Sequence, residues 1–304
     1  MKRSAVVGLV IAAVALVGLG LAAWWFLSRE PGPEATARAY LDSLAAGDGA
    51  RAVALLAAAP SGGVDLEKAF SGADAYPSDA RIGPVEDDGR GGAGVGVAYT
   101  LDGTQHEGSL GLVEQEGGWR VGADGLGALS PQTTLGTLVL VGGVAVPAGA
   151  STALLPAVYP VTAAPRGILE GSTSAAVAMG ATTDAAVEAS IAVQATMLAQ
   201  QQLESYARAC AKPAQTVPAN CGIRVPWAAD LASLASISFR IEQMPQLALS
   251  PDLRTFSATD GIVVATATGI TSDGAEASFS YRADDWALRG AVTLTPDGME
   301  LAVG

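Results

Sequence analysis

An uncharged run of 23 residues, Ala5–Leu27, stands near the start of the chain. As a helix that rises 1.5 Å per residue, this run would be about 34 Å long, enough to cross a bilayer core of about 30 Å. Lys2 and Arg3 precede the run, whereas Arg29 is followed directly by Glu30. This charge bias predicts a single transmembrane helix with a cytoplasmic N-terminus and the rest of the chain outside.

Aromatic residues close this run. Trp24, Trp25 and Phe26 stand where interfacial aromatic residues hold a helix at the membrane–water boundary. The alternative is a signal peptide cleaved near Trp25, but signal peptides have a shorter apolar region that ends in small residues. The pattern favours an uncleaved anchor, so the membrane is the first expected partner, through Ala5–Leu27.

After the expected anchor, apolar residues first recur with the spacing of a helix and then with the spacing of a strand. Apolar residues first recur at intervals of three and four, which is typical of an amphipathic helix: Ala37, Tyr40, Leu41 and Leu44. Gly47 suits the end of this helix, and Asp48 suits the N-cap of a second one. From Arg81 the period is two, and Asp102-Gly103 predicts the first hairpin turn of an antiparallel meander.

A linker and then a small β module are expected in the middle of the chain. Leu126–Thr134 carries no clear period and is interpreted as the linker. Leu138–Val141 and Val144–Val146 then flank a glycine pair, and Val158–Thr162 is a third short apolar run. Short apolar runs separated by glycine and proline are typical of strands joined by tight turns.

The last part of the chain predicts one helix packed on an antiparallel meander. Thr196 is the candidate N-cap, and apolar residues share one face of this helix: Ala199, Leu203, Tyr206, Ala207 and Cys210. Strands are then expected at six places: 237–241, 255–259, 262–268, 275–282, 286–293 and 299–303. Turns are expected at Asp-Gly and Asp-Asp pairs: 260–261, 273–274, 284–285 and 297–298.

Two stretches resemble known families. Two helices and a meander that ends in Gly-Gly-Trp-Arg-Val resemble the nuclear-transport-factor-2-like (SnoaL-like) family, which implies a cone-shaped α+β fold; the matching residues are ATARAYLDSLAAGDGARAVALL (35–56) and LVEQEGGWRV (112–121). TLVLVGGVAVPAGASTALLPAVYPVTA (137–163) is similar to the β module of TcaA-type envelope proteins and PEGA-like repeats, except that Ala157 replaces the glycine usual after Pro156. Patterns like the first are common in actinobacterial single-pass membrane-anchored proteins and lipoproteins, and the resemblance to TcaA-type and similar exported proteins implies a role in envelope homeostasis.

The expected fold class is therefore α+β, with an N-terminal transmembrane helix followed by three extracytoplasmic domains. The expected segments are residues 1–30 as cytoplasmic tip and anchor, 31–127 as the nuclear-transport-factor-2-like domain, 128–182 as the small β module, and 183–304 as a disulfide-stapled domain with a helix on an antiparallel sheet.

Charge limits the partners that the extracytoplasmic part can bind. Without Lys2, Arg3, Arg29 and Glu30, the chain keeps 14 basic and 29 acidic residues, a net charge of −15. Such a surface repels nucleic acid and anionic lipid or wall polymer, although the more ordinary interpretation is that the charge simply keeps the ectodomain soluble. We therefore expect a protein or a small apolar ligand, and no nucleic acid.

The two cysteines predict a structural bridge. Cys210 and Cys221 both fall in the expected exported part and are separated by ten residues. In an oxidising compartment a disulfide is the default for such a pair. Metal binding would need more ligands than the chain offers, because it has a single histidine and no Cys-x-x-Cys pair.

His106 is the only imidazole that could act in catalysis. Enzymes of the cone-shaped fold place His and Asp inside the cone for acid–base chemistry. However, Gln105, His106 and Glu107 begin a strand on its polar side, where an exposed residue is expected. A serine nucleophile is not indicated either, because the sequence has no Gly-x-Ser-x-Gly frame.

The sequence therefore favours a non-catalytic binding or sensing protein, held at the cell membrane with its ectodomain extracytoplasmic and without a cofactor. Two alternatives stay open. One is an enzyme that uses a cone-shaped pocket around His106. The other is a scaffold for an envelope complex, in which the anchor helix itself carries the interaction.

Overall fold

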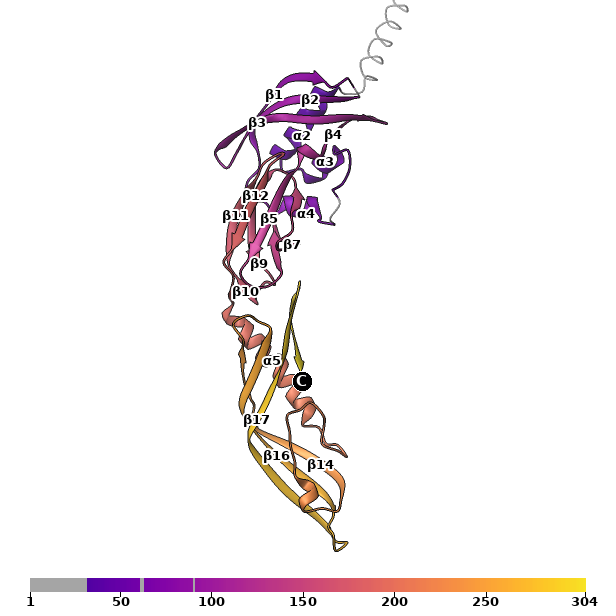
Figure 1. Cartoon of the computed structure of the whole chain (residues 1–304), viewed down its shortest axis with the longest axis vertical. Coiled ribbons are helices and arrows are strands. Elements are labelled where there is room, and N and C mark those ends of the chain that lie inside the picture. The colour runs from indigo at the N-terminus through magenta and orange to yellow at the C-terminus, as the bar shows by residue number, and fades with distance from the viewer. Residues whose placement is uncertain (1–31, 61–62, 90) are drawn as a thin grey trace, which may run out of the picture.

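The computed structural model describes residues 32–60, 63–89 and 91–304. The chain is a mostly-β α+β protein whose sheets, antiparallel except for the mixed sheet β12-β5-β8, follow one another along an elongated body (Figure 1). The expected anchor, Ala5–Leu27, with Trp24, Trp25 and Phe26, lies outside the described residues. Within the described ranges, no helix is both long and apolar enough to cross a bilayer.

The N-terminal lobe, residues 32–126, contains one four-stranded sheet in the order β1-β2-β3-β4 with helices packed against it. Its elements are α2 (Pro33–Ala45), α3 (Gly49–Ala54), α4 (Leu66–Ser71), β1 (Ser78–Asp87), β2 (Gly92–Leu101), β3 (Thr104–Gln115) and β4 (Gly118–Val121). The expected cap is confirmed, because the Asp48 carboxylate accepts from the Arg51 N–H at 3.0 Å. Gly47, just after α2, has a φ of 70°, as a helix-ending glycine should.

The core of this lobe forms where α2 lies on the sheet. Ala37, Tyr40, Leu41 and Leu44 are all buried, as their spacing predicts. The Tyr40 hydroxyl donates to the Gly125 carbonyl oxygen at 2.8 Å, so the largest side chain of the helix also satisfies its polar atom.

The middle lobe, residues 127–192, holds two small sheets, β11-β9-β6-β7 and β12-β5-β8, and the strand pair β10-β13. Its strands are β5 (Gly127–Thr133), β6 (Leu138–Val141), β7 (Val144–Pro147), β8 (Thr152–Leu154), β9 (Ala157–Ala163), β10 (Leu169–Glu170), β11 (Ser172–Val177), β12 (Thr182–Val187) and β13 (Ser190–Ile191). The expected linker at Leu126–Thr134 was wrong, because β5 is the central strand of its sheet. Leu129 is the only large apolar residue of β5, and Gly127 and Pro131 fill the other buried positions, so the strand lacks a visible period.

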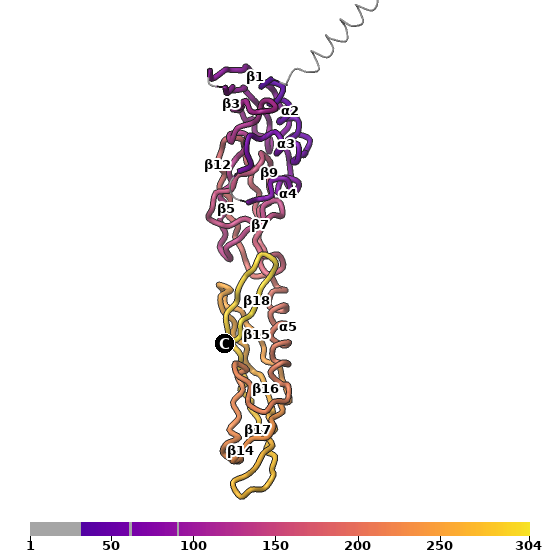
Figure 2. The backbone as a smooth tube through the Cα atoms, turned by 90° about the vertical axis from the view of Figure 1, so that its right-hand side faces the viewer, coloured from indigo at the N-terminus to yellow at the C-terminus, as the bar shows by residue number. Residues whose placement is uncertain are grey.

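The C-terminal lobe, residues 193–304, consists of α5 laid along a curled sheet in the order β14-β16-β17-β18, with β15 also paired to β16 (Figures 1 and 2). Its elements are α5 (Val193–Cys210), η2 (Trp227–Ala229), β14 (Ser233–Gln243), β15 (Gln246–Leu249), β16 (Thr255–Ile270), β17 (Glu276–Thr295) and β18 (Gly298–Val303). The helix begins at Val193 with Ala192 as N-cap, so the expected cap at Thr196 was wrong.

Two expected turns of this lobe are bulges inside long strands. Asp260 has a φ of 62°, but the chain does not reverse there, and β16 continues through Asp260-Gly261. The pairing of β16 with β17 shifts register on either side of Gly261, which lies opposite Trp286. Asp284-Asp285 likewise lies within β17. An Asp-Gly pair supplies the same positive φ to a bulge as to a hairpin, so the pair alone does not distinguish them.

Candidate binding site

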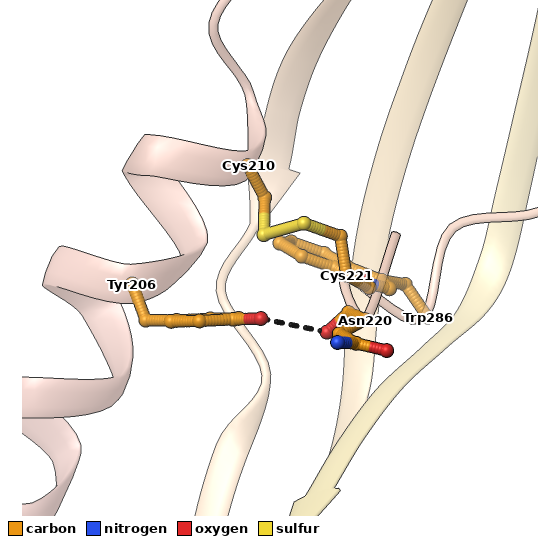
Figure 3. The surroundings of a disulfide bond; sticks show 5 residues. All are labelled: Tyr206, Cys210, Asn220, Cys221 and Trp286. Carbon is orange, nitrogen blue, oxygen red and sulfur yellow. Dashed lines mark hydrogen bonds between the residues drawn. A yellow bond between two sulfur atoms is a disulfide. The ribbon is translucent and has the colours of Figure 1, made fainter. Parts of the chain in front are cut away.

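A disulfide joins the end of α5 to the loop that follows it (Figure 3). Cys210 and Cys221 form the bridge expected from the sequence, with their Cα atoms 5.8 Å apart. On the helix side, Tyr206 lies one turn before Cys210, and its hydroxyl donates to the Asn220 carbonyl oxygen at 2.9 Å. The covalent bond and the hydrogen bond together fix residues 220–221 against α5.

Trp286 holds the same loop from the sheet side. Its ring lies beside the disulfide in Figure 3 and is 2 % exposed, and its indole N–H donates to the Cys221 carbonyl oxygen at 2.8 Å. Trp286 belongs to β17 at the point where that strand passes Gly261 of β16. The loop is thus fixed to both layers of the lobe.

The loop runs so close to β17 that one of its positions requires glycine. Gly222 has a φ of 63°, and a Cβ atom built there would lie 2.2 Å from the Ala287 carbonyl oxygen. Any side chain would meet both the backbone strain of the left-handed region and this clash. The close approach sets the distance between the loop and the strand.

A hollow of about 510 Å³ opens between this loop and β17. We call it the β17 hollow and define it by six of its lining residues: Asn220, Gly222, Arg224, Asp285, Arg289 and Gly304. It exists because β18 pairs with β17 only over Gly290–Thr295, and therefore leaves the preceding part of the β17 edge without a strand. In Figure 1 the C-terminus accordingly lies part of the way along the lobe.

Two arginines line the β17 hollow. Arg224 and Arg289 are both exposed, and within the described part of the chain neither forms an ion pair or a side-chain hydrogen bond. Asp285 is the acidic side chain of the hollow and lies more than 4.0 Å from either guanidinium, since no ion pair joins them. Two cationic groups are therefore free to bind a ligand.

His106 is remote from the β17 hollow, in β3 of the N-terminal lobe. Its ring stacks on Tyr99 with centroids 5.3 Å apart, which places it half-buried on the core face of the sheet and not at the exposed position expected. The Tyr99 hydroxyl accepts from the Met179 N–H at 2.9 Å, and burial raises the pKa of this hydroxyl. No hydrogen bond or ion pair joins His106 to another described residue, so no proton relay is assembled there.

Sequence reasoning found the disulfide but missed the hollow. Arg224 and Arg289 are 65 positions apart and belong to no motif, so nothing local marks them as neighbours. The described ranges also contain no candidate metal site, because they hold no group of three or more His, Cys, Asp or Glu side chains that could bind an ion.

Comparison with family models, curated proteins and solved structures finds no match for this chain. The resemblances based on residues 35–56, 112–121 and 137–163 therefore stay predictions from the sequence.

Proposed function

We propose that this chain is a non-catalytic binding protein, tethered to the cell membrane by Ala5–Leu27, that holds an extracytoplasmic partner in the β17 hollow. The observation that carries this proposal is the pair Arg224 and Arg289, whose side chains have no ion-pair or hydrogen-bond partner among the described residues and lie in a hollow whose walls are fixed. Fixed walls lower the entropic cost of binding, because few residues of the hollow have to become ordered when the partner binds.

The location is proposed from the sequence and from the disulfide. The charge bias around the apolar run directs residues 31–304 outward, and a disulfide persists in an oxidising compartment. In the sequence the N-terminal lobe follows the proposed anchor, and the C-terminal lobe lies at the opposite end of the elongated body from the N-terminal lobe (Figure 1). The binding site is then held away from the membrane surface.

The N-terminal and middle lobes serve as the support for this site in our proposal. We propose the nuclear-transport-factor-2-like cone for residues 31–127 and the TcaA- or PEGA-like module for 128–182, with 183–304 as the binding domain. Packing of α2 on a four-stranded antiparallel sheet supports the first assignment. Two small sheets stacked on a shared core support the second. By analogy this favours a role in envelope homeostasis.

Site-specific photo-crosslinking of the full chain in intact cells tests the function. A benzophenone amino acid at Asn220, on the rim of the hollow, is expected to form an adduct that mass spectrometry can identify. The same residue at Ser272, exposed in the loop between β16 and β17, is the control and should form none.

Charge removal gives the second arm of this experiment. Combined Arg224→Ala and Arg289→Ala substitutions should abolish the Asn220 adduct, while Arg254→Ala, an arginine of the same lobe that pairs with Asp252, should leave it intact. Equal adducts from Asn220 and Ser272, or an adduct that survives loss of both arginines, would contradict binding in the hollow.

A further inference from the structure

We infer that two copies of this chain pair side by side on the membrane through the exposed face of the first turns of α5. This inference goes beyond the proposed function, because it uses the proposed anchor but no residue of the β17 hollow. Three features lead to it: a group of exposed apolar side chains, the absence of charge around them, and the direction in which α5 runs.

Exposed apolar side chains are concentrated at the start of α5. Five large apolar residues of the described chain are exposed, and three of them lie within six positions of this helix: Val193, Met197 and Leu198, with exposed fractions of 86, 59 and 41 %. The other two, Val85 and Val113, lie on separate strands of the N-terminal lobe. Single exposed apolar residues are ordinary on a protein surface, whereas a contiguous group marks a contact with a partner.

Two of these side chains belong to a stripe that faces away from the sheet. Four exposed residues, which we call the α5 stripe, are spaced at i, i+3, i+4 and i+7, the pattern that one helix presents to another: Gln194, Met197, Leu198 and Gln201. Gln200 and Gln202 hydrogen-bond to the sheet. The two amides of the α5 stripe, by contrast, form no hydrogen bond with another described residue.

The lack of charge around the α5 stripe favours a second copy as its partner. No charged residue lies between Glu188 and Glu204, although residues 31–304 hold 14 basic and 29 acidic residues, a net charge of −15. Two copies of so acidic a chain repel each other over most of their surface, and this repulsion is weakest where both faces are uncharged. A glutamine amide both donates and accepts hydrogen bonds, so it can pair with its own copy, whereas two like charges repel.

The proposed anchor determines the direction of this pairing. Figure 2 shows α5 along one side of the C-terminal lobe, parallel to the length of the body. Two chains held at their N-termini in one membrane project in the same direction, so a two-fold axis between them brings the two α5 helices together in parallel. Each residue near such an axis faces its own copy. Met197 therefore meets Met197 of the second copy, and the Gln201 amide meets its counterpart.

The size of the α5 stripe predicts a weak contact that depends on the membrane. Residues 193–201 of a helix extend about 13 Å, so the area that they bury is well below the roughly 800 Å² per partner typical of stable dimers. Anchoring in one membrane raises the effective concentration of the second copy, as a short linker between two binding modules does. The pair therefore forms between anchored chains, where the buried area alone would not hold it.

Cysteine cross-linking of the full chain in its native membrane tests this pairing. Cys210 and Cys221 are bonded to each other and buried, so an engineered cysteine is the only free thiol of the chain. Met197→Cys is expected to give a covalent dimer on mild oxidation, as measured by non-reducing electrophoresis and mass spectrometry. Ser272→Cys, exposed in the loop between β16 and β17, is the control and should give only the background of random collisions.

Charge placed on the α5 stripe gives the second arm of this experiment. Adding Gln201→Glu to Met197→Cys places two carboxylates opposite each other and should lower the dimer yield about fivefold. Adding Thr196→Glu instead places the same charge beside the engineered thiol, at an exposed position outside the stripe. This control should leave the yield unchanged, which separates repulsion between the copies from any effect of an acid on the reactivity of the thiol.

The inference is overturned by equal dimer yields from Met197→Cys and Ser272→Cys, or by a yield that Gln201→Glu does not lower. A cross-link from Met197→Cys to a different protein would overturn it as well. None of these results bears on the β17 hollow, because Asn220 lies beyond the opposite end of α5. An Asn220 adduct without an α5 dimer would leave the proposed function in place and remove this inference.

Discussion

Single residues in this protein set the position of a whole loop. Gly222 allows the loop after α5 to approach β17, Trp286 receives the loop through its indole N–H, and Cys221 joins it to the helix. The disulfide could be predicted from the sequence, because two cysteines that are close together in an oxidising compartment normally form a bond. Gly222 and Trp286 could not, because their roles depend on a strand far along the chain.

Replacement of Gly222 by alanine tests this position. A non-glycine residue at positive φ costs about 1–2 kcal/mol, and the clash with the Ala287 oxygen should add at least about 1 kcal/mol. Gly274→Ala is the matched control, because Gly274 also has a positive φ, of 87°, but nothing lies within 4 Å of its Cβ position. Chemical denaturation should show the larger loss of unfolding free energy for Gly222→Ala. Equal losses of unfolding free energy for the two variants would show that the loop shifts away from β17 and avoids the clash.

Alkaline pH should destabilise the fold through Tyr40. Burial raises the pKa of its hydroxyl far above 10, with smaller contributions from Tyr99 and Asp124. The unfolded chain loses this proton near pH 10 while the folded chain keeps it, so stability is full below pH 10 and decreases as pH rises above it. One such group contributes a slope of about 1.4 kcal/mol per pH unit.

The variant Tyr40→Phe isolates this contribution. At pH 7 it should cost about 1–2 kcal/mol, because the Gly125 carbonyl oxygen loses its hydrogen-bond partner. Above pH 10 its unfolding free energy should decline less steeply than that of the wild type, as followed by denaturation at a series of pH values. Parallel curves for the two proteins would remove Tyr40 from the alkaline response.

At the scale of elements, α5 is held to the sheet by polar side chains as well as by its apolar face. Small residues, Ala195, Ala199 and Ala207, let the helix approach the sheet closely. Gln200 accepts from the Leu247 N–H at 2.9 Å and donates to the Pro245 carbonyl oxygen at 3.0 Å. Gln202 donates to the Met299 carbonyl oxygen at 2.8 Å on the other side. The helix thus bonds to both β15 and β18.

Gln200→Ala should therefore loosen β15. Loss of both hydrogen bonds is expected to lower the unfolding free energy by about 1–3 kcal/mol and to speed hydrogen exchange at the Leu247 amide. Gln201→Ala makes the same change one position along the helix, where the side chain is exposed. It should leave both measurements near wild type. Similar exchange rates at Leu247 in the two variants would show that the Gln200 hydrogen bonds do not hold β15 in place.

Helix caps and turns could be predicted where neighbouring residues in the sequence determine them. Strands were missed where pairing with a distant strand determines them. The cap at Asp48 and the turn at Asp102-Gly103 lie within a few residues of the groups they bind. By contrast, β5 forms because β8 and β12 pair with it, although its own residues carry little apolar pattern. The long strand β16 was likewise divided in the prediction, since an Asp-Gly pair does not reveal that pairing with β17 continues past it.

At the scale of the whole molecule, lobes follow one another from the N-terminal end of the described chain to the C-terminal lobe (Figures 1 and 2). A buried apolar cluster is shared by residues of all three lobes, including Tyr40, Tyr159 and Trp286. The helices before Arg81 and the strands after it could be predicted from the change in period along the sequence. The β17 hollow could not, because it depends on where β18 stops.

The proposed topology gives a test at this scale. Protease added to intact spheroplasts should digest residues 31–304 and spare an epitope tag at the N-terminus, because the charge bias keeps Lys2 and Arg3 in the cytoplasm. Immunoblotting with tag and ectodomain antibodies measures this, and carbonate washing should not release the protein. Protection of the ectodomain until lysis would reverse the orientation.

The order of the sheets along the chain also bears on the export that we propose for this protein. Each sheet draws its strands from one lobe: β1–β4 from the first, β5–β13 from the second and β14–β18 from the last. A chain that leaves a translocation channel N-terminus first can therefore complete each lobe's strand pairing before the next lobe emerges. Cys210 and Cys221 both belong to the last lobe, 11 positions apart, so they can be oxidised without waiting for any earlier segment to be rearranged.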